Sequence, residues 1–228
     1  MEITWYGGGC VRLRGKEGTI AADAFRSVVG PTGRGLTADI VTYSHPDPRP
    51  ELAARSRRSA AATIDGVALP TSLAGAFVLE SPGEYEVHDV LVTGVRSFRD
   101  EVHGAERGRN VCFVFELDGL HAIHLGDIGH TLSEQALGEI GTVEVACVPI
   151  GGSLAPARAA ELVAQLDANL VVPLPVGADE AADEAAMARF LHEMGVQERP
   201  APQGKLSVTV SSVPNETTLI LLEPRGRT

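Results

Sequence analysis

Apolar residues in the first half of the chain occur in short runs separated by glycine-containing turns. Runs at residues 3–6, 10–14, 19–22 and 39–43 predict β-strands. Strand character resumes at 76–79, 85–87, 90–95, 110–117 and 121–125, and Asp118-Gly119 predicts a hairpin turn between the last two. Residues 110–117 are apolar at nearly every position, which is typical of a strand that is covered on both faces. This half of the chain therefore predicts sheets.

The second half adds helical spacing. From Pro156, apolar residues at 159, 162, 163 and 166 recur with the period of a helix. This helix lies between apolar strands at 143–149 and 170–173, which predicts a β-α-β unit. A second amphipathic helix is predicted over 179–194, ending at Gly195, followed by strands at 206–212 and 218–222. A weaker pattern predicts a short helix over 48–60.

Strand groups flanked by helices favour an α+β fold in which two sheets pack face to face with helices outside. We expect a single domain over residues 1–228, because no linker or low-complexity segment divides the chain. The polar segment 102–109 is predicted to be a dispensable loop.

Composition excludes several classes of protein. The apolar fraction of 44% and the charged fraction of 21% are those of an ordinary globular protein. A net charge of −11 argues against nucleic acid as the main partner, because binding phosphates requires a basic surface. No signal peptide and no apolar run of membrane-spanning length is evident, which predicts a cytoplasmic protein without a membrane partner. The three cysteines lie far apart in apolar surroundings and are predicted to be buried free thiols.

Several stretches together resemble the Zn-dependent hydrolases of the metallo-β-lactamase fold, specifically their small bacterial branch. The stretches are Trp-Tyr-Gly-Gly-Gly-Cys-Val-Arg-Leu at 5–13, Ala-Asp at 22–23, Pro-Gly-Glu-Tyr-Glu-Val at 82–87, Glu-Arg-Gly-Arg-Asn at 106–110, His-Leu-Gly-Asp-Ile-Gly-His at 124–130 and Val-Pro-Leu-Pro-Val-Gly at 172–177. Their order is more specific than any one of them. The resemblance implies an αββα four-layer sandwich with the active site along one edge of the sheets.

In that family two zinc ions share a bridging carboxylate and a hydroxide, and Asp127 matches the bridging position. Without gaps, His45 takes the first His of the H-x-H-x-D-H loop, whereas Asp47, Arg49 and Pro50 replace the second His, the Asp and the last His. With a two-residue deletion, Asp47 keeps the Asp role and Pro48 replaces the last His. Either register leaves at least two ligands of this loop missing.

Two further ligand positions carry residues that cannot bind a metal. Arg99 and Pro175 stand where the family has histidines, and a guanidinium has no lone pair to offer. The sequence therefore favours no metal and no other cofactor. We expect an arginine to supply the positive charge instead, with Arg99 pairing to Asp127 or Asp100.

Other candidate residues are predicted to have structural roles around the site. Asp23, Asp100 and His124 match residues around the site. We interpret His124 as structural because a single histidine at a strand end is usually hydrogen-bonded. The Gly151-Gly152-Ser153 turn precedes a helix, and Ser153 is predicted to cap it.

Three hypotheses follow. In the first, the protein is not a catalyst, or is an altered one, and its arginine-lined cleft binds a small anionic ligand or a protein partner. In the second, it is a metal-dependent hydrolase with one zinc held by His45, Asp47 and Asp127. In the third, it is a structural subunit that pairs with an active homologue. Homo-oligomers are compatible with all three.

Overall fold

The computed structural model describes residues 1–48, 63–64 and 67–225. The helix predicted over 48–60 lies outside the described residues, apart from Pro48. Fifteen strands are described, and they form two large sheets and one small hairpin, β5 (Thr63–Ile64) with β6 (Val67–Ala68).

The first large sheet contains six strands in the order β14-β1-β2-β3-β4-β7. Its first three strands in sequence form an antiparallel meander, whereas β4 and β7 join β3 in parallel. Short Gly-containing turns allow this meander, as the sequence pattern predicts. The strands are β1 (Glu2–Gly7), β2 (Cys10–Arg14), β3 (Thr19–Ala22), β4 (Ile40–Thr42), β7 (Phe77–Leu79) and β14 (Leu206–Ser207).

The second sheet contains seven strands in the order β15-β13-β12-β11-β10-β9-β8. Strands β8 to β11 are antiparallel, and β12, β13 and β15 continue in parallel from β11 because helices connect them. The strands are β8 (Gly83–Val87), β9 (Val90–Phe98), β10 (Arg109–Leu117), β11 (Leu120–His124), β12 (Val145–Ile150), β13 (Leu170–Pro175) and β15 (Thr218–Leu219).

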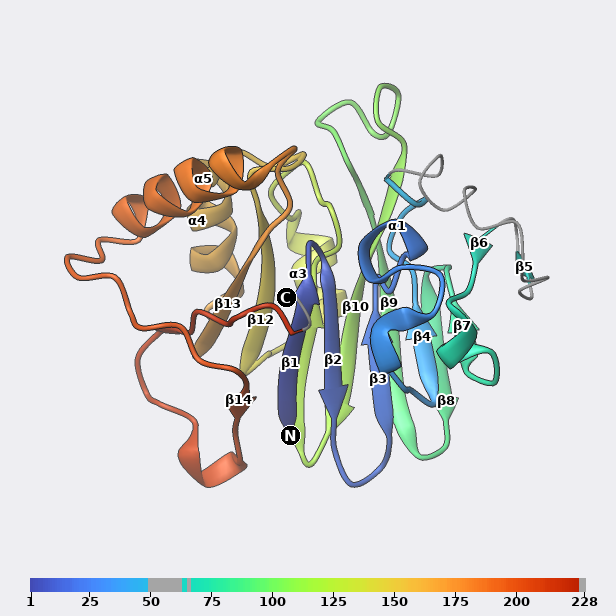
Figure 1. Cartoon of the computed structure of the whole chain (residues 1–228). Helices are drawn as coiled ribbons and strands as arrows, with labels where there is room; N and C mark the ends of the chain where they lie inside the picture. Colours follow the sequence, from blue (N-terminus) through green and yellow to red (C-terminus); the bar gives the residue numbers. More distant parts are fainter. Residues whose placement is uncertain (49–62, 65–66, 226–228) are drawn as a thin grey trace.

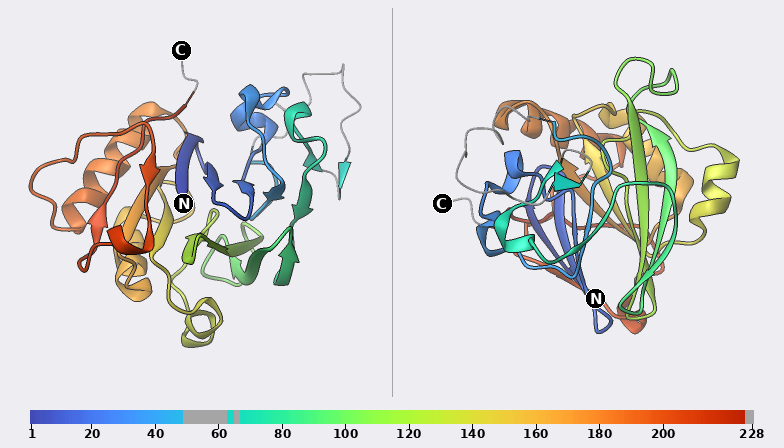
Figure 2. Two further views of the ribbon diagram at one scale, coloured as in Figure 1. Left: turned by 90° about the horizontal axis from the view of Figure 1, so that it is seen from below. Right: turned by 90° about the vertical axis from the view of Figure 1, so that its right-hand side faces the viewer.

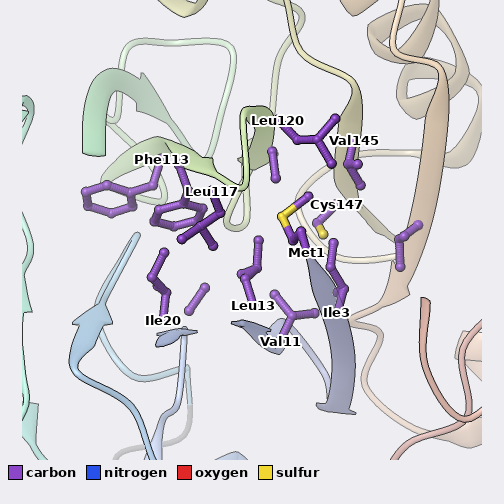
Figure 3. Packing of buried hydrophobic residues seen from close by; sticks show 14 of the residues in the cluster. Met1, Ile3, Val11, Leu13, Ile20, Phe113, Leu117, Leu120, Val145 and Cys147 are labelled. Atoms are coloured by element: carbon purple, nitrogen blue, oxygen red, sulfur yellow. The ribbon is translucent and has the colours of Figure 1, made fainter. Parts of the chain in front are cut away.

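The two sheets pack face to face, and helices cover their outer faces (Figures 1 and 2). The core between the sheets brings Ile3 and Leu13 of the first sheet against Phe113 and Leu117 of the second (Figure 3). A second apolar cluster lies under α3 (Glu134–Ile140), α4 (Pro156–Leu166) and α5 (Glu180–Glu193). A third lies under α1 (Arg26–Val29), η1 (Gly33–Gly35) and η2 (Thr71–Leu73). The predicted αββα sandwich is confirmed.

Some local predictions need correction. The alternating segment 206–212 is a strand only over β14, and it then turns into a 3-10 helix, η3 (Val210–Ser212). The side chains of Thr209 and Ser212 cap each other's backbone there, which favours a turn over an extended strand. The spacing of apolar residues did not reveal α1 or α3, because both helices have fewer than two full amphipathic periods. No helix in the described part of the chain has the length and apolarity needed to cross a membrane.

The topology places several segments at one edge of the sandwich, the upper edge in Figure 1. The turn between β1 and β2, the ends of β3, β4, β9, β11, β12 and β13, and the beginning of α5 all lie at this edge. The residues singled out from the sequence follow these strand ends, so the fold brings them together.

Candidate functional site

A cavity of about 410 Å³ opens at this edge. Its polar wall contains Asp23, His45 and Asp127 from the strand ends, together with residues from the beginning of α5. Its apolar wall includes Phe25 and Val176. The cavity therefore coincides with the position predicted for the active site.

Asp127 is held by an arginine fork. Nε and Nη2 of Arg99 both donate to Oδ2 of Asp127, at 2.9 and 2.7 Å. The backbone N–H of Ser153 donates to Oδ1 at 2.9 Å, and its hydroxyl donates to Oδ2 at 2.8 Å. The backbone N–H of Asp127 in turn donates to Oδ1 of Asn110. Of the two partners expected for Arg99, the structure thus pairs it with Asp127.

The backbone around Asp127 leaves little free space. Gly126 has a φ of +68°, and a Cβ there would collide with Ser44 and Asn110. A Cβ on Gly152 would lie 2.7 Å from Oδ1 of Asp127 and 2.6 Å from Val176. The glycines of these turns are what allow the chain to approach the carboxylate so closely.

Asp100 lies away from the cavity and organises the loop between β9 and β10. Its carboxylate accepts hydrogen bonds from four backbone N–H groups of residues 102–107, at 2.6 to 3.1 Å. Desolvation raises the pKa of Asp100, but the four N–H donors together outweigh it and leave the pKa below its ordinary value.

The loop reaches back to the site. Nη1 of Arg99 donates to the carbonyl of Arg107, and Nη1 of Arg107 donates to the hydroxyl of Ser153 at 3.1 Å. Segment 102–109, which was predicted to be dispensable, thus contacts both the arginine that holds Asp127 and Ser153.

A second hydrogen-bonded chain runs from Asp23 to His45. The hydroxyl of Ser44 donates to Oδ2 of Asp23 at 2.6 Å and lies 2.7 Å from Nδ1 of His45. Because the single hydroxyl proton goes to the carboxylate, Nδ1 of His45 is the donor to Ser44 and Nε2 keeps its lone pair. The His45 ring lies 5.0 Å from that of Phe25, and burial lowers the pKa of His45, with Asp23 and Asp127 opposing part of this effect.

His124 connects the two halves of the site. Its Nε2 lies 2.8 Å from the carbonyl of Gly9, and its Nδ1 accepts from the N–H of Gly126 at 3.3 Å. This pattern has Nε2 donating to the Gly9 carbonyl and Nδ1 accepting. Nδ1 also lies 3.9 Å from Oδ2 of Asp23.

The remaining candidate positions do not all line the cavity. Asp47 accepts a hydrogen bond from the hydroxyl of Ser27, and Pro175 lines the cavity. Arg49 lies outside the described residues. Within the described ranges, no group of three or more His, Cys, Asp or Glu side chains has an arrangement that could hold a metal ion.

Residues 2–175 match the model of the family described as "Beta-lactamase superfamily domain". The chain belongs to this family.

Its relatives include metal-dependent hydrolases. A UPF0173 metal-dependent hydrolase from Methanoculleus marisnigri is 28% identical over 185 residues, which cover 76% of this chain and 80% of the relative. One from Methanosphaerula palustris is 26% identical over 191 residues, covering 76% and 83%. A solved structure from Thermotoga maritima, assigned to the Zn-dependent hydrolases of the metallo-beta-lactamase superfamily, is 27% identical with a TM-score of 0.69 and covers 97% of both chains.

The sequence did not reveal the roles of three residues in the site of this beta-lactamase superfamily member. Ser44 links Asp23 to His45, Asn110 accepts from the N–H of Asp127, and Ser153 donates to the Asp127 carboxylate. Ser153 was predicted to cap α4, but the N-cap is Ala155 and no side chain caps that helix. Ser153 is instead drawn to Asp127 by two hydrogen bonds to an ionised group, which are stronger than a single cap. The adjacent Gly151-Gly152 pair was the available signal, because it lets the backbone approach a carboxylate.

Proposed function

We propose that this protein is a family member without a metal centre, whose cavity binds a small molecule and does not carry out metal-assisted hydrolysis. The observation that carries the proposal is the fork between Arg99 and Oδ2 of Asp127. Asp127 matches the carboxylate that bridges the two zinc ions in the resembled hydrolases. Here one oxygen of that carboxylate, Oδ2, is occupied by a permanently charged guanidinium.

The physical argument concerns charge and lone pairs. A guanidinium stays protonated and offers no lone pair to a metal. A guanidinium bound to the carboxylate also repels a divalent cation that would bind the same carboxylate. It also removes the need for a metal, because a carboxylate that is largely buried must be paired with a positive charge. The side chain of Asp127 is only 13% exposed. Arg99 therefore satisfies the electrostatic requirement that a metal would otherwise meet.

The remaining donor set also fits a di-zinc centre poorly. Pro175 offers no side-chain donor atom at all, and both oxygens of Asp127 already accept hydrogen bonds from Ser153. His45 presents one imidazole nitrogen to the cavity. Among the described residues it does not join two further ligands in an arrangement that could hold a metal, and one nitrogen alone does not bind zinc tightly at neutral pH.

Metal analysis tests this proposal. The protein is purified without added metal and its zinc, iron and manganese contents are measured by mass spectrometry, followed by calorimetric titration with zinc. We expect well under one metal per chain and no tight zinc binding. We also expect no hydrolysis of phosphodiester, lactone or lactam substrates when zinc or manganese is added. Stoichiometric metal in the unspiked protein would overturn the proposal.

Two variants sharpen the test. Arg99→His removes the guanidinium and adds an imidazole beside Asp127, so we expect it to gain zinc binding that the natural chain lacks. Arg158→His is the matched control, because Arg158 makes exposed ion pairs with Glu101 and Glu161 away from the cavity. If both variants and the natural chain bind zinc equally, Arg99 does not exclude the metal.

The same titration addresses the alternative of a hydrolase with a single zinc. That alternative requires one equivalent of metal whose binding is lost on replacement of His45 or Asp127 and which supports turnover. Native mass spectrometry from cell extract tests the remaining alternative, in which the chain pairs with a protein partner.

A further inference from the structure

The polar groups that line the cavity have one feature in common: they accept hydrogen bonds. Nδ1 of His45 faces Ser44, so Nε2 is the ring nitrogen left for the cavity, and it carries a lone pair. The His45 side chain is only 7% exposed, and no described residue donates to Nε2. Most of the ring is buried, and Nε2 opens to the cavity, where a ligand can supply the donor.

Carboxylates surround the same space. Asp23 and Asp127 lie at the strand ends, and Asp179, Glu180 and Asp183 lie at the beginning of α5. No lysine or arginine is among the described residues that line the cavity. The described wall is thus strongly negative, and a concave surface concentrates that potential.

The helix explains part of this acidity. Asp179 caps α5 by accepting from the N–H of Ala182, and Asp183 accepts from the N–H of Gly177 at 2.7 Å. These bonds use one oxygen of each carboxylate. They do not account for Glu180, nor for the lone pair of His45.

The rest of the wall is apolar. Phe25, Val28, Pro175, Val176 and Ala178 contribute to it. A volume of about 410 Å³ suits a small organic molecule, since ligand cavities commonly measure about 300–1,000 Å³. The ligand should therefore combine a hydrocarbon body with a polar group that only donates.

We propose that this cavity binds a small organic cation, with a primary ammonium group directed to His45 and the carboxylates and a hydrocarbon body against the apolar wall. This inference deepens the proposed function and rests on it, because a metal at Asp127 would repel such a ligand. It also reverses the sign expected from the sequence. The anionic ligand was expected from an arginine-lined cleft, whereas Arg99 turns to Asp127 and is not among the residues of the wall.

Calorimetry with three probes of one shape tests the inference: phenethylammonium, phenethyl alcohol and 3-phenylpropionate. We expect phenethylammonium to bind at least about tenfold more tightly than the alcohol, the difference typical of one hydrogen bond to a charged group. The carboxylate should bind more weakly still. Equal affinity for the ammonium and the alcohol, or tighter binding of the carboxylate, would overturn the inference.

Variants identify the groups involved. His45→Asn keeps a side-chain donor near Ser44 but lacks the atom at Nε2, and we expect about tenfold weaker binding of phenethylammonium. Asp183→Asn keeps the acceptor for Gly177 while removing one charge, and Asp179→Asn keeps the helix cap, so both should weaken ammonium binding and leave alcohol binding unchanged. Glu134→Gln is the control, because it removes a charge from the first turn of α3, outside the cavity. If the control weakens binding as much as the cavity variants, net charge alone acts and the inference fails.

Failure of this inference differs from failure of the proposed function. If the protein is free of metal and binds none of the three probes, or binds the carboxylate most tightly, only the inference of an organic cation is refuted. Stoichiometric zinc that phenethylammonium does not displace refutes both.

Discussion

The pair between Arg99 and Asp127 should be worth a measurable part of the protein's stability, and a double-mutant cycle measures it. Arg99→Met keeps the length and apolar stem of the side chain and removes its charge. The variant leaves the Asp127 carboxylate with the two hydrogen bonds from Ser153 and no positive partner. Asp127→Asn removes the negative charge from the other side.

The magnitude follows from the geometry. Two charge-assisted hydrogen bonds are lost, and removal of one partner of a fully buried pair costs about 3–5 kcal/mol. This pair is partly screened, because the side chain of Arg99 is 22% exposed and that of Asp127 is 13% exposed. Ser153 also retains its bonds to the carboxylate. We therefore expect a coupling free energy of about 2 kcal/mol between the two positions.

Urea unfolding, followed by the fluorescence of the single tryptophan, Trp5, is a suitable assay. With an m-value of about 3 kcal/mol/M, a loss of about 2 kcal/mol lowers the urea midpoint of Arg99→Met by about 0.7 M. Arg158→Met is the matched control and should change stability by less than about 0.5 kcal/mol, because its ion pairs are exposed. A coupling free energy between Arg99 and Asp127 below about 0.5 kcal/mol, the size expected for an exposed ion pair, would refute the idea that Arg99 replaces a buried cation.

Three further predictions concern the surroundings of the site. Gly152→Ala should lower the free energy of unfolding by about 1–3 kcal/mol in urea melts, because its Cβ meets Asp127 and Val176, whereas Gly138→Ala in open space on α3 should raise it slightly. Because the pKa of Asp100 is lowered in the folded state, its contribution to stability is present above about pH 4 and is lost as the pH falls through the folded-state pKa. Asp100→Asn should therefore make the free energy of unfolding less dependent on pH in the acid range. An unchanged pH dependence would contradict this. Burial raises the pKa of all three thiols, for two of them to about 12, so iodoacetamide should label the folded protein far more slowly than the urea-unfolded one by mass spectrometry; the thiols are Cys10, Cys112 and Cys147.

The elements that sequence reasoning located best are those with many repeated signals. Strands β2 and β3 have the bounds predicted for them, and α4 begins at the predicted Pro156 with its predicted apolar face buried. Each of these segments has apolar side chains at a regular period next to glycine or proline, so local preference and burial agree. Where only one turn of helix forms, as in α1, the segment is too short to show a helical period of apolar residues.

Several residues that the sequence singled out line one cavity, but their contacts could be predicted only in part. Motif order placed Arg99 and Asp127 just after two strands, β9 and β11, which flank β10 and end at the same edge of the sheet. The partner of Arg99 could not be chosen, because Asp100 is adjacent in sequence and equally charged. The backbone decides the choice: Asp100 turns into its own loop, where four N–H groups already satisfy it, and Arg99 is left to reach across to Asp127.

The charge of the cavity wall is the reason why we propose an organic cation in place of the anionic ligand expected from the sequence. An arginine next to a cleft suggests an anion only if its guanidinium is free to meet one. In this protein Asp127 and the carbonyl of Arg107 accept from the guanidinium of Arg99, which turns its charge inward and cancels one carboxylate. The carboxylates of α5 and the lone pair of His45 then dominate the described wall. One ion pair therefore accounts for both proposals: it makes a metal unnecessary at Asp127, and it leaves the cavity with the charge that an organic cation would neutralise.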